Sequence, residues 1–247
     1  MGNPFFNFKA FSVQQGGAAM KVCTDACLFG ALLPIVGESK ARALDIGTGT
    51  GLLSLMYAQR NAFVVIDAIE LEEAAYNQAK ENFQASPWSD RIRVIQGDFR
   101  KFTPLASNLE TQSGNERYDL IFSNPPFFSG DLKSADEAKN RAHHSSDLSF
   151  NSLVEKSARL LGSAGLFTVL IPFARGQEMR AIARENGLYL IQEYLVRQSP
   201  DHAYFRVIQL FSRENANLAE ESICIREANQ QYSLKFAELL RPYYLYL

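Results

Sequence analysis

The sequence predicts an α/β fold in which a mostly parallel, seven-stranded sheet with an antiparallel last strand carries helices on both faces. Three observations support this prediction. Short apolar runs alternate with segments of helical period, which is typical of a parallel sheet covered by helices. The first run leads into closely spaced glycines and then a helix-period segment. The last two runs are separated by residues 199–203, too few to cross over to a parallel neighbour, so the last strand should run antiparallel.

The elements follow one another in a regular order. Apolar runs predict strands at residues 43–46, 64–70, 92–96, 118–123, 165–171, 188–197 and 205–212. Segments of helical period predict helices at residues 51–60, 72–85, 149–162 and 175–186. Residues 103–117 and 128–147 lack either period and are expected to be loops. The second of these follows a candidate active-site motif, and such loops are often functional.

The composition narrows the class of protein. With 247 residues, 47% hydrophobic and 21% charged, a single domain over 1–247 can bury a substantial core. The net charge of -2 gives no general attraction to nucleic acid, so any RNA contact must come from a local patch. Three cysteines suggest a reducing compartment, and neither a signal peptide nor an apolar run of membrane-spanning length is visible. These features predict a cytoplasmic protein without a membrane segment.

No metal site is expected. Cys23 and Cys27 are four residues apart, but no second pair of ligands accompanies them at the spacing of a zinc site. The neighbouring His143 and His144 also lack a third and fourth ligand at a recognisable spacing.

The tetrapeptide Asn124-Pro125-Pro126-Phe127 directly follows the fourth predicted strand. An Asn-Pro dipeptide alone usually marks a chain reversal. Here the Asn124 side chain and a backbone carbonyl, held rigid by two prolines, can together accept both hydrogens of a planar amino group, and Phe127 offers a stacking face for a ring. We interpret Asn124, Pro125 and Phe127 as candidate catalytic residues, and Asn124 also as a candidate cofactor contact.

A glycine-rich turn follows the first predicted strand, with Gly47, Gly49 and Gly51 ahead of a helix. Such a turn presents backbone N–H groups to a ligand. The dinucleotide fingerprint requires glycine where this chain has Leu52, which disfavours NAD. Asp45 would repel a pyrophosphate but suits a ligand with an ammonium group, such as S-adenosylmethionine. The alternative role of Asp45 is to cap the turn.

Acidic residues also end the second and third predicted strands. Glu70 is placed to accept hydrogen bonds from both ribose hydroxyls, with Asp67 and Glu72 as alternatives. Asp98 can accept from an adenine amino group while Phe99 packs on the ring. Taken singly, Asp98 fits a turn as well as a ligand site. Because ligands of open α/β sheets bind at the carboxyl ends of strands, the succession of motifs at four strand ends favours a cofactor site.

These motifs resemble those of class I amino-methyltransferases that modify exocyclic nitrogens, which share a Rossmann-like sheet. The residues that carry this resemblance are Asp45–Gly51, Glu70, Asp98–Phe99 and Asn124–Phe127. Further segments are similar to the bacterial tRNA1(Val) adenine-N6 methyltransferases, which act on adenosine 37 beside the anticodon. They are Phe8–Val13, Ala19–Gly30, Arg141–His143, Tyr232–Phe236 and Tyr243–Leu245.

The resemblance implies methyl transfer from S-adenosylmethionine to N6 of an adenine in the anticodon loop of tRNA, by a monomer. It implies a segment over 1–42 that covers the cofactor, a catalytic core over 43–213 and a C-terminal extension over 214–247. Lys21, Thr24 and Asp25 would then lie in the part that closes over the methionine moiety. Cys23 stands where the family has a glycine before the Thr-Asp pair.

The predicted RNA contacts lie in the loop after the catalytic motif, at Lys133, Lys139, Arg141 and His143. The alternative is a solvated loop whose acidic residues cancel this charge. Other functions also stay open at this point. They are an rRNA guanine-N2 methyltransferase, a protein glutamine-N5 methyltransferase, in which Tyr usually stands where this chain has Phe127, a nicotinamide-dependent oxidoreductase and a non-catalytic binding module.

Overall fold

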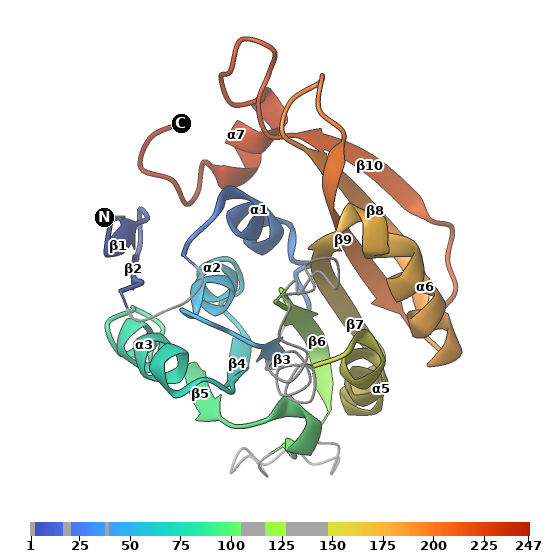
Figure 1. The fold of residues 1–247 in the computed structure, drawn as a ribbon. Coiled ribbons are helices and arrows are strands. Elements are labelled where there is room, and N and C mark those ends of the chain that lie inside the picture. The colour runs from blue at the N-terminus through green and yellow to red at the C-terminus, as the bar shows by residue number, and fades with distance from the viewer. Residues whose placement is uncertain (1–2, 17–20, 38–39, 105–116, 127–147) are drawn as a thin grey trace, which may run out of the picture.

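The computed structural model describes residues 3–16, 21–37, 40–104, 117–126 and 148–247. Eight strands in these ranges form a central sheet in the order β10-β8-β9-β7-β6-β3-β4-β5 (Figure 1). The strands are β3 (Ala41–Ile46), β4 (Val64–Glu70), β5 (Ile92–Gln96), β6 (Tyr118–Ser123), β7 (Leu161–Pro172), β8 (Tyr189–Arg197), β9 (Tyr204–Ser212) and β10 (Ala219–Cys224). The seven predicted strands are thereby confirmed, with small shifts at their ends.

Strand β9 runs against its neighbours. It pairs antiparallel with β7 and with β8, whereas the other neighbouring pairs of this sheet are parallel. The predicted reversal is confirmed, and its cause is the short turn between β8 and β9, which cannot reach across to a parallel position.

The strand β10 was not predicted. Its sequence, Ala219–Cys224, includes two consecutive glutamates and pairs on one side only, with β8. Most of its residues are exposed or half-buried, so the apolar pattern that marks the inner strands is absent. A polar edge strand of this kind is recognisable from its pairing and not from its hydrophobic period.

Helices cover both faces of the sheet, as predicted (Figure 1). One face carries α1 (Thr24–Leu32), α2 (Leu52–Arg60) and α3 (Glu73–Gln84), and the other carries α5 (Phe150–Leu160) and α6 (Gly176–Glu185). Two buried clusters result, one on each side, and both faces of the central strands lie in the core. Because both faces are buried, the sequences of those strands are nearly continuous runs of apolar residues. Two short 3-10 helices, η1 (Phe99–Lys101) and η2 (Phe173–Arg175), follow β5 and β7.

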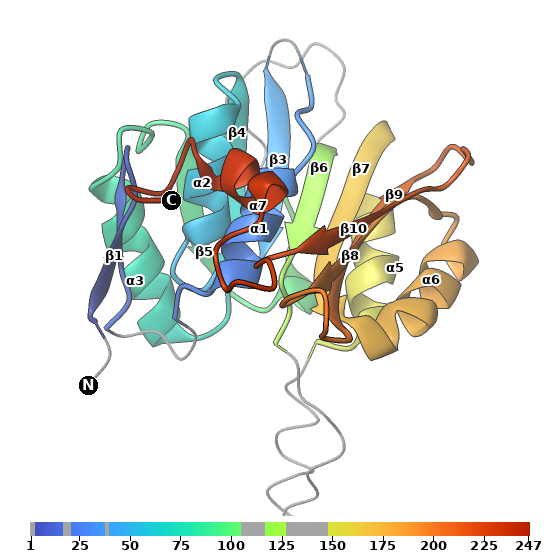
Figure 2. The ribbon, with the colours of Figure 1, turned by 90° about the horizontal axis from the view of Figure 1, so that it is seen from above.

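The two end segments of the chain lie side by side (Figures 1 and 2). A hairpin of β1 (Phe5–Asn7) and β2 (Ser12–Gln14) precedes α1, and α7 (Leu234–Leu240) precedes the C-terminal tail. The Lys9 amide donates to the Tyr243 carbonyl at 2.8 Å, and Phe8 forms a bridge with Tyr244. Ser233 caps α7 by accepting from the Phe236 amide at 3.1 Å. The hairpin and the tail therefore stabilise each other.

Candidate active site

The predicted cofactor and catalytic residues lie at one edge of the sheet. Strands β3, β4, β5 and β6 are parallel neighbours, so their carboxyl ends meet at this edge. Ile46 of β3 is in register with Ile69 of β4 and with Ser123 of β6. The glycine turn, Glu70 and Asn124 follow these positions directly. The structure thus brings together the residues that the sequence placed at separate strand ends.

The glycine turn needs its glycines for different reasons. Gly47, Gly49 and Gly51 have φ angles of 68°, 58° and 84°, which other residues rarely adopt. A Cβ atom at Gly51 would collide with the Phe83 ring, so this position also requires a small residue for packing. At Gly47 and Gly49 a Cβ would meet no atom within 4 Å, so the turn is open on that side. A cradle of this kind allows a ligand to approach the backbone closely.

Asp45 is fully buried near the end of β3. Its Oδ2 atom accepts hydrogen bonds of 2.7 Å from the hydroxyls of Thr48 and Ser54. Its Oδ1 atom is also buried and has no hydrogen-bond partner within the described part of the chain. Burial raises the pKa of Asp45 to about 6, the two hydroxyls act against this rise, and the charge of Glu70 adds to it. One oxygen therefore stabilises the turn, and contact of the other with a cationic ligand stays a prediction.

Glu70 ends β4 opposite the glycine turn. Its Oε2 atom accepts from the Gly49 amide at 2.8 Å, and its Oε1 atom accepts from the amides of Leu71 and Glu72 at 2.8 and 3.0 Å. The carboxylate is thus fixed beside the backbone that a cofactor would contact. Glu72, one of the alternatives, is exposed and stands at the N-cap of α3. The position of Glu70 favours it as the ribose ligand.

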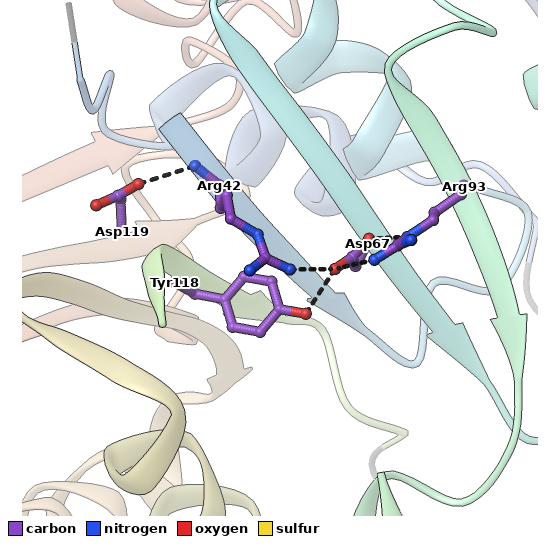
Figure 3. A network of polar contacts seen from close by, with 5 residues as sticks. All are labelled: Arg42, Asp67, Arg93, Tyr118 and Asp119. Carbon is purple, nitrogen blue, oxygen red and sulfur yellow. Dashed lines mark hydrogen bonds and ion pairs between the residues drawn. The ribbon is translucent and has the colours of Figure 1, made fainter. Parts of the chain in front are cut away.

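Asp67, the other alternative, belongs to a separate buried network (Figure 3). Its carboxylate accepts from Arg42 at 3.2 Å, from the Tyr118 hydroxyl at 2.6 Å and from Arg93, whose Nη2 atom is 3.1 Å away. Tyr118 and Arg42 belong to the first residues of β6 and β3, at the opposite ends from the glycine turn. Asp67 therefore joins strands together and is not placed to bind a ribose.

Asp98 and Phe99 follow β5 at the expected position. The Asp98 carboxylate caps η1 and accepts from the Arg100 amide and Nε atom at 2.9 and 3.0 Å. The hydrogen bonds from Arg100 lower the pKa of Asp98. Phe99 is 5% exposed and its ring stacks on Phe102, so most of it serves the core. Contact of either residue with an adenine ring stays a prediction.

Asn124 continues from β6 into the catalytic motif. The neighbouring Ser123 donates from its hydroxyl to the Ile46 carbonyl at 2.8 Å, which fastens the end of β6 to β3. The Asn124 Oδ1 atom is buried and has no partner among the described residues, although the residue as a whole is half-buried. A buried acceptor without a donor costs about 1–3 kcal/mol. Asn124 and Asp45 therefore both present unsatisfied oxygens, on neighbouring strands at one edge.

The N-terminal segment reaches the same edge through α1. Thr24 is the first residue of this helix, and Asp25 forms an ion pair of 2.9 Å with Arg206 of β9. Arg206 is in register with Pro172, the last residue of β7, at the carboxyl edge. Lys21 precedes the helix and is exposed. Contact of Lys21 or Thr24 with a cofactor stays a prediction.

Sequence reasoning missed two residues that support the site. Ser54 supports Asp45, as described above. Asn82 of α3 is buried and donates to the Thr50 and Gln14 carbonyls at 2.8 and 2.9 Å, while accepting from the Gln14 amide at 2.8 Å. It therefore joins the glycine turn to β2. These contacts join each helix residue to a strand or turn elsewhere in the chain, so a single sequence carries no periodic signal for them.

Several predicted residues lie outside the described ranges. They are Phe127 of the catalytic motif and the four predicted RNA contacts Lys133, Lys139, Arg141 and His143. Within the described ranges, no group of three or more histidine, cysteine or acidic residues is arranged to hold a metal ion. None of the helices there combines the length and the apolar character needed to cross a bilayer. All three cysteines are unpaired thiols.

The chain is similar to known methyltransferases in sequence and in fold. The family model described as methyltransferase small domain matches residues 29–176. A protein of Tolumonas auensis named tRNA1(Val) (adenine(37)-N6)-methyltransferase is 41% identical over 246 residues, which cover 99% of this chain and 98% of that one. A protein of the same name from Bacteroides fragilis is 40% identical, with 99% of each chain covered. The solved structure of a predicted O-methyltransferase from Agrobacterium tumefaciens has a TM-score of 0.65 and 17% identity, over 88% of this chain and 96% of that one. This last likeness concerns the fold alone.

Proposed function

Since the chain belongs to the methyltransferase small domain family, together with these tRNA1(Val) (adenine(37)-N6)-methyltransferases, we propose that it methylates N6 of an adenine in tRNA, namely adenosine 37 of tRNA1(Val). The chain is an S-adenosylmethionine-dependent methyltransferase. The proposal for the substrate rests on the names of its relatives and on the acceptor geometry of its own site. Expected with it are a cytoplasmic location and a monomeric state.

The residues present fit S-adenosylmethionine. The Oδ1 atom of Asp45, which has no partner in the described ranges, suits the ammonium of the methionine moiety. Glu70, fixed beside Gly49, suits the ribose hydroxyls. Asp98 is the candidate acceptor for the adenine amino group. No phosphate has to be accommodated next to these carboxylates, which agrees with the absence of the dinucleotide fingerprint at Leu52. When bound, this cofactor supplies an electrophilic methyl group on a sulfonium centre.

The observation that carries the proposal is the Oδ1 atom of Asn124 at this edge, which is buried and has no hydrogen-bond partner among the residues that the structure describes. An exocyclic amine is a weak nucleophile because its lone pair is delocalised into the ring. The Asn124 oxygen and the Pro125 carbonyl can each accept one of its N–H groups. Both hydrogen bonds strengthen as positive charge develops on nitrogen, so they stabilise the transition state more than the ground state.

The same two acceptors orient the amine. With both N–H groups fixed, the nitrogen lone pair points toward the methyl group, in line with the bond that breaks. A strong general base is not required, because the nitrogen loses its proton readily once it is cationic. Phe127 would stack on the adenine after it leaves its own stack, which costs little for an unpaired loop base.

The other functions that the sequence left open have less support. A guanine-N2 or glutamine-N5 methyltransferase can use the same acceptor pair, but the relatives named above carry the adenine-N6 activity in their names. A nicotinamide-dependent oxidoreductase would need a third fingerprint glycine at position 52. This chain has Leu52 there, the first residue of α2. A binding module without catalysis gives no reason for the paired acceptors at Asn124 and Pro125.

The direct test uses labelled S-adenosylmethionine and small RNA from a strain that lacks the gene. Nucleoside mass spectrometry should find N6-methyladenosine, and sequencing of the product should place it at position 37 of tRNA1(Val). Label in guanosine, or in a glutamine-containing protein and not in RNA, would refute the proposed substrate while leaving the methyltransferase assignment in place.

A further inference from the structure

A ridge of arginine and aromatic side chains borders the candidate active site. It consists of Phe173, Arg175, Arg197, Tyr204 and Arg206. None of these residues belongs to the cofactor or catalytic set described above. They come from η2, from the end of β8 and from the start of β9.

The strand register places the ridge next to Asn124. Ser123, the last residue of β6, pairs with Val169 of β7. β7 continues for three more residues to Pro172, which pairs with Arg206 of β9. Phe173 follows directly, and the β8–β9 turn lies at this edge too (Figure 2). The ridge therefore extends beyond the end of β6, along the edge formed by the end of β7 and the start of β9.

The aromatic part of the ridge is exposed and paired. Phe173 is 42% exposed, and its ring centroid lies 5.5 Å from that of the half-buried Tyr204. The two rings meet at 46°. The Tyr204 hydroxyl donates to Ser222 at 3.1 Å, which fixes the ring. Two supported rings at a surface edge form a platform on which an unpaired base can stack.

Arg197 supplies charge beside this platform. Its guanidinium lies 5.7 Å from the centre of the Tyr204 ring and donates to the Pro200 carbonyl at 3.0 Å and to the Cys224 sulfur at 2.9 Å. These partners orient the group without neutralising it, and no carboxylate among the described residues pairs with it. A preorganised arginine loses little conformational entropy when it binds a phosphate.

Two further arginines repeat the arrangement. Arg175 lies 3.8 Å over the Phe150 ring and is held by Glu178, and Arg206 lies 5.3 Å from the Phe205 ring and pairs with Asp25. Their carboxylate partners offset their charge, so Arg197 is the strongest candidate for a phosphate contact. Exposed aromatic faces and guanidinium groups are the side chains on which single-stranded nucleic acid stacks its bases and places its phosphates.

We propose that this ridge binds the RNA strand next to the methylated adenine, with Arg197 on a phosphate and Phe173 and Tyr204 under a neighbouring unpaired base. The inference rests on the proposed function in taking RNA as the substrate. It explains how a chain with a net charge of -2 can hold RNA through a local patch. It adds a surface from separate strands to the loop contacts predicted from the sequence.

The test measures binding and catalysis separately on Phe173→Ala and Arg197→Gln. Both side chains are partly exposed, so the fold should tolerate the changes. Matched controls are Phe63→Ala, an exposed ring before β4, and Arg184→Gln, an exposed arginine in the last turn of α6. Binding is followed by the fluorescence anisotropy of a labelled anticodon stem-loop, with cofactor affinity from calorimetry.

Each ridge variant should weaken stem-loop binding by about tenfold and leave cofactor affinity unchanged. The two control variants should bind the stem-loop as the native protein does. Arg197→Gln should also reduce the salt slope of binding by about one. Unchanged binding in both variants would overturn the ridge and leave the proposed function intact. If the native protein methylates a different base and the ridge variants still lose stem-loop binding, the ridge is supported and the proposed function is refuted. Native protein that binds no RNA would refute the ridge.

Discussion

Ser54 donates a 2.7 Å hydrogen bond to the Oδ2 atom of Asp45 from the first turn of α2. Thr48 donates to the same oxygen at the same distance, so both hydroxyls hold one side of the carboxylate. The other oxygen has no partner within the described ranges. The two hydroxyls decide which oxygen of Asp45 is available to a ligand. They also oppose the effect of burial, which raises its pKa to about 6.

Cofactor affinity should depend on the charge of Asp45. Because its pKa is raised to about 6, protonation begins closer to neutrality than for an ordinary aspartate. Affinity should be nearly constant above about pH 7, fall to about half near pH 6 and then approach a tenfold loss for each further pH unit. Calorimetric titrations across this range measure the effect. Asp45→Asn should bind more weakly and without this pH dependence, and native affinity that is flat from pH 5 to 7 would contradict the assignment.

Ser54→Ala should move the midpoint of that pH profile upward. The substitution removes one of the two hydroxyl hydrogen bonds that favour the ionised form of Asp45. At neutral pH the loss of affinity should be modest, and it should grow as the pH falls. Ser157→Ala is the matched control, because Ser157 is equally buried but its hydroxyl has no hydrogen-bond partner in the described structure. An unchanged midpoint in Ser54→Ala would show that this hydroxyl has no influence on the carboxylate.

Asn124→Ala should lower turnover by about 10²–10³-fold, the usual effect of removing one hydrogen bond that stabilises a transition state. Affinity for S-adenosylmethionine should stay nearly the same, because the ammonium and ribose ligands are unaffected. Single-turnover assays and calorimetry separate the two quantities. Asn186→Ala, which removes an amide bound to the Ile182 carbonyl at the end of α6, serves as the control. Surviving turnover together with collapsed cofactor affinity would show that Asn124 has been misassigned.

Glu70→Gln should weaken S-adenosylmethionine binding by about 1.5–3 kcal/mol, because a neutral amide replaces a charged acceptor. The carboxylate is fixed at 2.8 Å from the Gly49 amide, so the substitution acts directly beside the glycine turn. The neighbouring Glu72→Gln, an exposed position, provides the comparison. Equal affinity in both variants would argue that the ribose hydroxyls bind elsewhere.

Tyr118→Phe should lower stability and leave cofactor affinity unchanged. Its hydroxyl donates to Asp67 at 2.6 Å in the buried network of Figure 3, and loss of a hydrogen bond to a charged group costs about 1.5–3 kcal/mol. Thermal and urea unfolding measure the change. Tyr189→Phe, at the start of β8 and without a described hydrogen bond from its hydroxyl, should have little effect. A fall in cofactor affinity in Tyr118→Phe would mean that Asp67 contributes to the cofactor site after all.

The parts of the fold that depend on local pattern could be predicted from the sequence. β3, β4 and β6 are apolar because both faces are covered, and Asp45, Glu70 and Asn124 stand out as polar groups where these runs end. Since the carboxyl ends of parallel strands share an edge, the prediction of a parallel sheet was enough to place these residues at one edge. The reversed β9 followed from the length of one turn.

The remaining features depend on contacts between distant parts of the chain. Ser54 reads as an ordinary polar residue until α2 is placed against Asp45. Arg197 and Phe173 carry no motif, and they become neighbours only when β7, β8 and β9 pair. β10 is acidic and lies at an edge, so its strand character comes from pairing with β8. A single sequence contains no periodic signal for such relationships.

The hydrogen bond between the Lys9 ammonium and the Arg241 carbonyl joins residues 232 positions apart. A ribosome adds about 5–20 residues per second, so roughly 10–50 seconds separate the synthesis of the two partners. During that interval the N-terminal hairpin lacks the tail against which it packs, and closing so long a loop is intrinsically slow. The hairpin also reaches the glycine turn through Asn82. The nascent chain can therefore pair β3, β4, β5 and β6 early, but the contact between the N-terminal hairpin and α7 with its tail forms only after Arg241 has left the ribosome.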